Sequence, residues 1–124
     1  MTKNAPVSRA GRKLQLRIRV VGIEGDALGP GKAQLLEQVQ ETGSLNKAAA
    51  RLEMSYMKAW RLAEAMNENF LEPLLEKTRG GSARGGTCLT PTGRKVLAIY
   101  HRMCAKAEEA AQVDWKTFLS LMKS

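Results

Sequence analysis

The stretch Thr42–Asn67, TGSLNKAAARLEMSYMKAWRLAEAMN, contains two short helical patterns that meet at a joint of three residues. Ser44 and Ser55 each supply the side-chain oxygen that an N-cap needs. Small and apolar residues recur at helical spacing after each serine, up to the joint in the first case and up to Met66 in the second. The stretch therefore predicts a short helix, a joint at Leu52–Met54 and a longer second helix.

These two predicted helices have the packing features of a helix-turn-helix. Small Ala48 and Ala49 allow a close approach at a steep angle, and Met54 fills the corner. A recognition helix contacts base edges mainly with its N-terminal residues, while the preceding helix crosses the phosphate backbone. The outer face of the second helix carries Tyr56, Lys58, Trp60, Arg61 and Glu64, with Ser55 in its first turn. The phosphate-contacting candidates on the preceding helix are Ser44, Lys47 and Arg51. An ordinary helical hairpin with a solvated basic face remains the alternative.

The charge balance favours a polyanionic partner. The 124 residues contain 20 Lys and Arg against 12 Asp and Glu, which gives a net charge of +8. Double-stranded DNA is the first expectation and a membrane surface the weaker one. No stretch approaches the length of a membrane span. No secretory signal is present, and Cys88 and Cys104 lack zinc-site spacing. We therefore expect a cytoplasmic protein with reduced thiols; a redox-sensing cysteine pair is the alternative.

The N-terminal part is predicted to precede the helix-turn-helix with one strand and one helix. Residues 1–13 are polar and basic and are expected to form a flexible tail. Leu14–Val20 alternates apolar and polar residues, as a half-buried strand does, and its expected partner is the hairpin near residue 80. The glycines from Gly22 to Gly31 predict a loop, and Lys32–Glu41 predicts a helix that ends at Thr42-Gly43.

A glycine-rich hairpin is predicted directly after the second helix. Pro73–Thr78 and Thr87–Leu89 are strand-like, and the eight residues between Thr78 and Thr87 include four glycines. Arg79 and Arg84 on this tip are candidates for contacts with DNA phosphates or a groove. A hairpin in this position is the wing of a winged helix. A phosphate-binding P-loop is the alternative, but no Gly-Lys-Ser/Thr follows and a strand stands where its helix should begin.

The C-terminal part predicts helices with more apolar surface than one small domain needs. Thr90-Pro91 is a typical helix start. The apolar positions beyond it would expose a large patch in a monomer, and a symmetric dimer would cover that patch. The dimer-interface candidates are Leu97, Tyr100, Met103, Cys104, Trp115, Phe118 and Leu119. Folding of the last helix back onto its own domain is the alternative.

Together these patterns predict a mainly α (α+β) winged helix-turn-helix with a small antiparallel β wing and a long C-terminal dimerisation helix. The expected domain limits are 14–90 for the DNA-binding part and 91–124 for the helical dimerisation region. An enzyme is the poorest fit, because His101, the sole histidine, has no evident carboxylate or nucleophile as a partner. We expect no catalytic residues, no metal and no cofactor. Trp60 is expected to pack beneath the recognition helix; exposure to a base or to a partner is the alternative.

Several motifs closely resemble the DNA-binding domain of the molybdate-dependent transcriptional regulator (ModE) family over roughly residues 14–110. The resemblance rests on Gly43-Ser44, Ala48-Ala49, Met54-Ser55-Tyr56, Ala59-Trp60, Met66-Asn67, Pro73-Leu74, Gly80-Gly81, Gly85-Gly86 and Leu89-Thr90-x-x-Gly93. The Ser44–Leu52 pattern and the L-T-x-x-G motif are also similar to the LysR type of winged helix. The resemblance implies a bacterial homodimer that binds a palindromic operator and is linked to molybdate or molybdenum genes. On the basis of the resemblance, the recognition-helix candidates are Ser55, Tyr56, Lys58 and Arg61, and the wing candidates are Arg79 and Arg84.

The sequence departs from that family in two ways. Full-length members carry C-terminal molybdate-binding domains, and the residues up to Ser124 do not supply them, so we expect no molybdate binding by this chain. Arg61 stands where the family usually has an acidic residue, so we expect a different operator sequence. Two other functions remain open: a winged-helix protein-interaction module anchored by exposed aromatics, and a sequence-neutral DNA-binding protein whose affinity depends on its charge alone.

Overall fold

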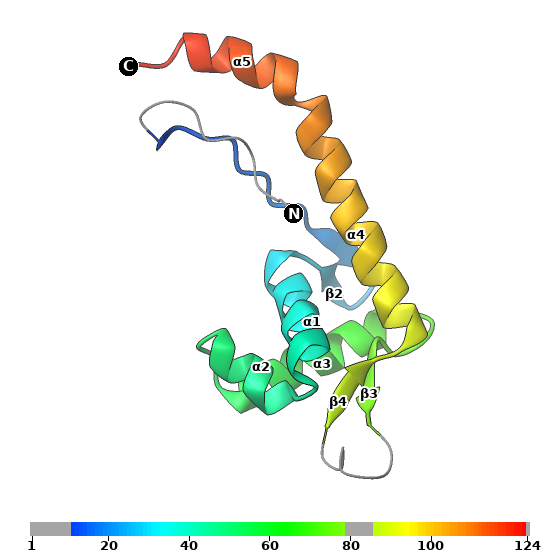
Figure 1. Ribbon diagram of the computed structural model, residues 1–124. Coiled ribbons are helices and arrows are strands. Elements are labelled where there is room, and N and C mark those ends of the chain that lie inside the picture. Colours follow the sequence, from blue (N-terminus) through cyan, green and yellow to red (C-terminus); the bar gives the residue numbers. More distant parts are fainter. Residues whose placement is uncertain (1–10, 79–85, 124) are drawn as a thin grey trace.

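In the computed structural model the chain is described at residues 11–78 and 86–123. The elements in chain order are β1 (Val20–Gly22), β2 (Gly25–Leu28), α1 (Pro30–Thr42), α2 (Leu45–Arg51), α3 (Tyr56–Asn69), β3 (Leu75–Lys77), β4 (Thr87–Leu89), α4 (Pro91–Ala110) and α5 (Gln112–Ser120). Figure 1 shows α1, α2 and α3 gathered into one cluster beside the β3–β4 hairpin, with α4 leading away from it to α5. This arrangement confirms the predicted α+β winged helix-turn-helix.

The helix boundaries follow the predicted caps. The Oγ of Ser44 accepts a hydrogen bond from the amide of Lys47 at 3.0 Å, and the Oγ of Ser55 accepts one from Lys58 at 3.1 Å. Gly43 ends α1 with a φ of 70°, a left-handed conformation that glycine adopts without steric cost. Local capping by Ser44, Ser55 and Gly43 therefore explains the start of α2, the start of α3 and the end of α1.

The joint between α2 and α3 turns sharply at Glu53, whose φ is 56°. The amide of Met54 donates to the carbonyl oxygen of Ala49 at 3.0 Å, which satisfies a group at the end of α2. Ala48 and Ala49 are buried where the helices meet, and the Met54 side chain packs against the core. The predicted packing of the corner is confirmed.

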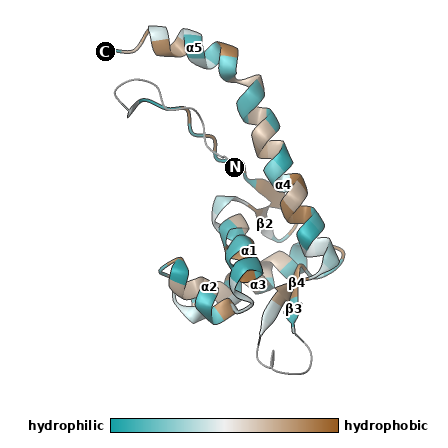
Figure 2. Cartoon of the chain, viewed as in Figure 1, coloured by the Kyte–Doolittle hydropathy of each residue, from teal (hydrophilic) through white to brown (hydrophobic). Residues whose placement is uncertain are grey.

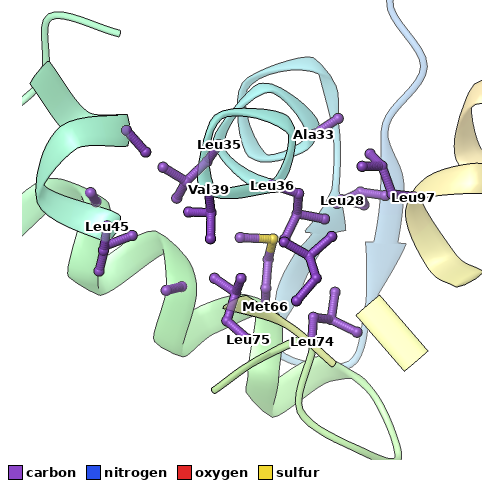
Figure 3. Packing of buried hydrophobic residues seen from close by; sticks show 14 of the residues in the cluster. Leu28, Ala33, Leu35, Leu36, Val39, Leu45, Met66, Leu74, Leu75 and Leu97 are labelled. Atoms are coloured by element: carbon purple, nitrogen blue, oxygen red, sulfur yellow. The ribbon is translucent and has the colours of Figure 1, made fainter. Parts of the chain in front are cut away.

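The core lies between α1 and α3 and is closed by the wing. Its largest fully buried side chains are Leu35, Leu36, Val39, Met66 and Leu74. Figure 3 shows Met66 pointing from α3 toward the α1 side chains, with Leu74 and Leu75 beside it. Because α1 and the entry to the wing both pack on Met66, the position of α3 relative to the wing is set by the core.

The N-terminal strand prediction was wrong in its extent and in its partner. Strand β1 contains only Val20–Gly22 and pairs in antiparallel fashion with β2, which lies in the stretch predicted to be a loop. Ala27 and Leu28 are buried, so this short hairpin supplies core contacts despite its glycines. The alternation in residues 14–18 instead reflects an extended segment whose apolar side chains are half-buried.

That extended segment is fixed to α4 by Tyr100. The hydroxyl group of Tyr100 donates to the carbonyl oxygen of Ile18 at 2.7 Å. Burial, together with neighbouring Cys104, raises the pKa of Tyr100 to about 12, so the phenol keeps its proton at neutral pH. Leu97 lies one turn earlier and is also buried in the core. The first half of α4 therefore belongs to the core, and Leu97 and Tyr100 do not lie on an exposed face available to a second subunit.

The first and last parts of the described chain meet at one hydrogen bond. The guanidinium group of Arg12 donates to the carbonyl oxygen of Lys123, so the end of the segment expected to be a flexible tail is in contact with the C-terminal part. The rest of that expected tail, residues 1–10, lies outside the described residues. Among the helices of the described residues, none is both long enough and apolar enough to cross a membrane.

Candidate nucleic-acid interface

The outer face of α3 is exposed to solvent. Ala59, Ala63 and Met66 point into the core, at the predicted spacing. The other side of the helix exposes large side chains, with Tyr56 49% exposed and Met57 54% exposed. A buried stripe of small residues thus holds α3 against the core and leaves its bulky side chains to solvent.

Trp60 belongs to this exposed face. It is 44% exposed, so the expectation that it packs beneath the helix was wrong. The reason is helical phase: Trp60 follows Ala59 by one residue, which turns it about 100° away from the buried stripe. The small Ala59, which belongs to the predicted apolar stripe, occupies the place beneath the helix.

Charge changes sign along the outer face of α3. Lys58 and Arg61 are exposed in the first two turns, whereas Glu64 and Glu68 are exposed in the last two. Within α3, which is described throughout, the first turn has no acidic residue. Acidic side chains normally stabilise the N-terminal end of a helix, so a lysine there does not stabilise the isolated helix. A lysine at this position can instead bind an anionic partner. The N-terminal half of α3 is therefore the half suited to approach a polyanion.

The phosphate candidates of α2 lie at the two ends of that helix. Ser44 is half-buried and its Oγ is engaged in the cap, whereas Lys47 is exposed. The guanidinium of Arg51 lies 3.0 Å from the carboxylate of Glu41 and 3.1 Å from Oε1 of Gln38. Such an exposed ion pair contributes at most about 1 kcal/mol, so Arg51 can exchange it for a phosphate at little cost.

The wing is a short two-stranded ladder. Leu75 pairs with Leu89, and Lys77 pairs with Thr87. Beyond the ladder, the amide of Thr78 donates to the carbonyl oxygen of Gly86 at 3.0 Å. The wing candidates Arg79 and Arg84 lie outside the described residues.

Asn67 connects α3 to the wing, a role that the sequence analysis did not assign. Its Oδ1 accepts hydrogen bonds from the amides of Leu74 at 2.8 Å and Leu75 at 3.2 Å, and its Nδ2 donates to the carbonyl oxygen of Leu75 at 3.3 Å. An amide side chain is needed because the site requires both a donor and an acceptor. The motif Met66-Asn67 quoted above pointed to this asparagine, but residue spacing alone could not show which groups its side chain binds.

Replacing Asn67 with alanine is expected to lower the free energy of unfolding by about 1–3 kcal/mol, because the partly buried backbone groups of the wing lose their partners. Urea denaturation measures this change. Gln40→Ala, which removes an exposed amide from α1, is the control and should stay within about 0.5 kcal/mol of the parent chain. Equal stability of the two variants would mean that Asn67 does not hold the wing.

The dimer candidates divide into buried and exposed residues. Besides Leu97 and Tyr100, Trp115 is buried; its ring stacks on Phe118 with centroids 6.1 Å apart. Cys104 and Leu119 are half-buried. Met103 is 43% exposed and Phe118 is 62% exposed, and exposed Ile99, Val113, Leu121 and Met122 also lie on α4 and α5 or just beyond. Figure 2 shows hydrophobic segments recurring along α4 and α5, away from the helix-turn-helix core.

Among the described residues, the remaining polar groups that could take part in chemistry are His101 and the two cysteines. His101 has a carboxylate partner after all, since its Nε2 lies 2.6 Å from Oε2 of Glu37. This exposed pair joins α1 to α4. In the described part of the chain no group of three or more His, Cys, Asp or Glu could hold a metal ion. Cys88 and Cys104 are free thiols.

Residues 31–94, just over half of the chain, match the family model of bacterial regulatory helix-turn-helix proteins of the lysR family. The chain belongs to this lysR family. The matched region runs from the start of α1 to the start of α4 and so contains the helix-turn-helix and the wing.

Curated relatives of this lysR-family chain carry names connected with molybdenum. The transcriptional regulator ModE of Haemophilus influenzae is 37% identical over 69% of this chain and 34% of its own length. The molybdenum transport protein ModE of Azotobacter vinelandii is 34% identical over 81% of this chain and 41% of its own length. The chain thus spans between a third and somewhat over two fifths of these relatives. The similarity agrees with the resemblance of its motifs to the ModE family.

A solved structure shares the fold. The CbnR DNA-binding domain, in its crystal structure with DNA, superposes with a TM-score of 0.55 at 23% sequence identity. The match covers 70% of this chain and 94% of that domain. At this identity the likeness concerns the winged helix-turn-helix fold.

Proposed function

We propose that this chain is a sequence-specific DNA-binding transcription regulator that acts as a homodimer on a palindromic operator. The observation that carries the proposal is the exposed N-terminal half of α3, where Lys58 and Arg61 stand on a helix start without acidic residues. Lysine and arginine there can donate to guanine O6 and N7 in the major groove. The family and the fold support the same function.

In this proposal the parts of the domain have separate roles. The first two turns of α3 enter the major groove, with Ser55, Tyr56, Lys58 and Arg61 facing the bases and the adjoining backbone. Lys47 and Arg51 on α2 neutralise phosphates, and Arg79 and Arg84 do so from the wing. Phosphate contacts position the domain, and base contacts specify the sequence. No catalytic step is part of this function.

Dimerisation through the C-terminal helices would place two recognition helices on successive turns of DNA, about 34 Å or a multiple of it apart. The support is the apolar surface of α4 and α5, above all Phe118 and Met103. A second subunit related by two-fold symmetry would bury the same residues on both sides. A palindromic operator follows from that symmetry.

Changing Phe118 to aspartate is expected to raise the dimer dissociation constant at least about tenfold, since each subunit would lose a buried phenyl ring and bury a charge instead. Sedimentation equilibrium over a concentration series measures the constant. Ile23→Asp is the matched control: Ile23 is 97% exposed on the β1–β2 turn, outside the proposed interface, and its replacement should leave the constant unchanged. A parent chain that is monomeric at all concentrations would contradict the dimer.

We further propose that the operators lie at genes for molybdenum transport or use, on the strength of the names of its relatives. Because the resemblance covers the DNA-binding part of the ModE family, we expect molybdate to leave the DNA affinity of these 124 residues unchanged. Titration of an operator duplex with and without molybdate tests that expectation, and a difference beyond twofold would contradict it.

Selection from a pool of random duplexes by the purified chain tests the proposed function. We expect enrichment of a sequence with two inverted half-sites whose centres are one or two helical turns apart. Failure to enrich any sequence would contradict operator recognition and would favour sequence-neutral DNA binding or a protein-interaction module. Single, unrepeated half-sites would contradict the symmetric dimer while preserving the recognition helix.

A further inference from the structure

We propose that Met57 and Trp60 contact the C5-methyl groups of thymines in the operator and thereby set its A·T positions. This inference rests on the proposed function, because it specifies which groups of the bases α3 contacts. Met57 was not a candidate in the sequence analysis, and exposure of Trp60 to a base was only the alternative there. The structure brings both onto the exposed face, 54% and 44% exposed respectively.

The two residues flank the charged groups of the same face. Met57 is one turn before Arg61, and Trp60 is one turn before Glu64, so all four follow the exposed side of α3. Tyr56, Trp60 and Asn67 form one stripe along the helix, and Asn67 is bonded to the start of the wing. Trp60 therefore lies on the flank of α3 that faces the wing, whereas Met57 lies nearer the outermost line.

The composition of the helix decides which bases such a face can read. In the major groove, adenine is usually recognised by the amide of Asn or Gln, guanine by Arg or Lys, and thymine by an apolar contact with its methyl group. Residues 55–66 contain no Asn or Gln, and Asn67 is already bonded to the wing. Adenine readout by a paired amide is thus missing from this face, which favours recognition of A·T pairs through the thymine methyl group.

Met57 and Trp60 supply the apolar surface that this contact needs. Methionine is flexible and adapts to an irregular surface, and an indole ring combines a large apolar face with one N–H donor. Leaving both in solvent is unfavourable for the free protein, and burying them against thymine methyl groups removes that cost. The geometry therefore points to a half-site that combines guanines, contacted by Lys58 and Arg61, with thymines contacted by Met57 and Trp60.

The experiment replaces thymine with deoxyuridine, which lacks only the methyl group, at each position of the selected operator in turn. Fluorescence anisotropy then measures the affinity of the parent chain, Met57→Ala, Trp60→Ala and the conservative variants Met57→Leu and Trp60→Phe. Leu71→Ala is the control, because Leu71 is a fully exposed apolar residue beyond the C-terminal end of α3. Circular dichroism verifies that every variant is folded.

We expect the parent chain to lose about fourfold in affinity for each contacted methyl removed, from the transfer free energy of one buried methyl group. Met57→Ala and Trp60→Ala should each abolish the loss of affinity caused by deoxyuridine at one position. Met57→Leu and Trp60→Phe should restore that loss. Leu71→Ala should show the same loss as the parent chain. Equal binding of thymine and deoxyuridine operators by the parent chain, or an undiminished loss in both alanine variants, overturns the inference but not operator recognition. Absence of any preference for the operator over a scrambled duplex overturns the proposed function itself.

Discussion

Alanine in place of Lys58 or Arg61 is expected to lower the affinity for the selected operator about 5- to 150-fold, corresponding to the 1–3 kcal/mol that a good base contact supplies. The affinity for a scrambled duplex should fall much less, because only one positive charge of the net +8 is removed. Anisotropy titrations on both duplexes measure the two changes. The ratio of operator to scrambled affinity is the informative quantity.

Lys116→Ala separates a base contact from a simple loss of charge. Lys116 is exposed on α5, so this control has the same net charge as Lys58→Ala but leaves α3 unchanged. We expect it to preserve the preference for the operator. If Lys58→Ala, Arg61→Ala and Lys116→Ala all lowered the affinity by the same factor on the operator and on the scrambled duplex, the recognition-helix assignment would fail. Charge alone would then explain binding.

Arg61→Lys refines the same test. The planar guanidinium can form two parallel hydrogen bonds with O6 and N7 of guanine, whereas an ammonium group forms them with less geometric specificity. We therefore expect Arg61→Lys to keep the affinity for scrambled DNA and to lose part of the preference for the operator. Full preference in the lysine variant would indicate that Arg61 contacts a phosphate.

Gly93→Ala is expected to destabilise the fold by about 1–3 kcal/mol or more, because an added Cβ would overpack a tight contact. That Cβ would lie 2.2 Å from the carbonyl oxygen of Leu74 and 3.0 Å from its carbonyl carbon, so backbone would have to move. Urea denaturation measures the loss. The control, Gly31→Ala in the first turn of α1, meets nothing within 4 Å and should be neutral or stabilising by up to about 1 kcal/mol.

The same contact explains the Leu89-Thr90-x-x-Gly93 motif in physical terms. The amide of Thr90 donates to the carbonyl oxygen of Leu74 at 2.9 Å, and its hydroxyl group donates to that of Pro73 at 2.7 Å. The start of α4 is therefore bonded to the backbone that enters the wing, and only glycine fits one turn later. Unchanged stability of Gly93→Ala would contradict this close approach.

The helical parts of the fold were predictable because their signals are local. The serine and threonine caps, the small residues at the α2–α3 crossing and the proline at the start of α4 act within a few residues of the chain. The first hairpin was missed because its strands are very short and its pairing depends on burial of Ala27 and Leu28 against helices far along the chain. The alternation of apolar and polar residues in 14–18 correctly indicated which side chains are half-buried. It did not reveal that the backbone of these residues forms no strand.

The candidate site was predictable in its charges and less so in its apolar groups. Lys58 and Arg61 lie on the exposed face of α3 as expected, whereas Trp60 was assigned to the core from its residue type against its helical phase. Leu97 and Tyr100 were assigned to a dimer because the sequence could not show how much of α4 the core would use. The contact of His101 with Glu37 depends on tertiary packing and has no sequence signal of its own. The contact of Asn67 with the wing also depends on tertiary packing, and the Met66-Asn67 motif did not show which groups Asn67 binds.

The central claim, operator recognition by the first two turns of α3, is tested most directly by titrating the selected duplex and a scrambled control over a series of salt concentrations. Binding that depends only on phosphates weakens steeply with salt and ignores base identity, whereas base contacts leave a preference that persists. We predict an operator affinity at least about 100-fold higher than the control at physiological salt, with the preference retained as salt increases. Equal affinities and one shared, steep salt dependence for the two duplexes would contradict it.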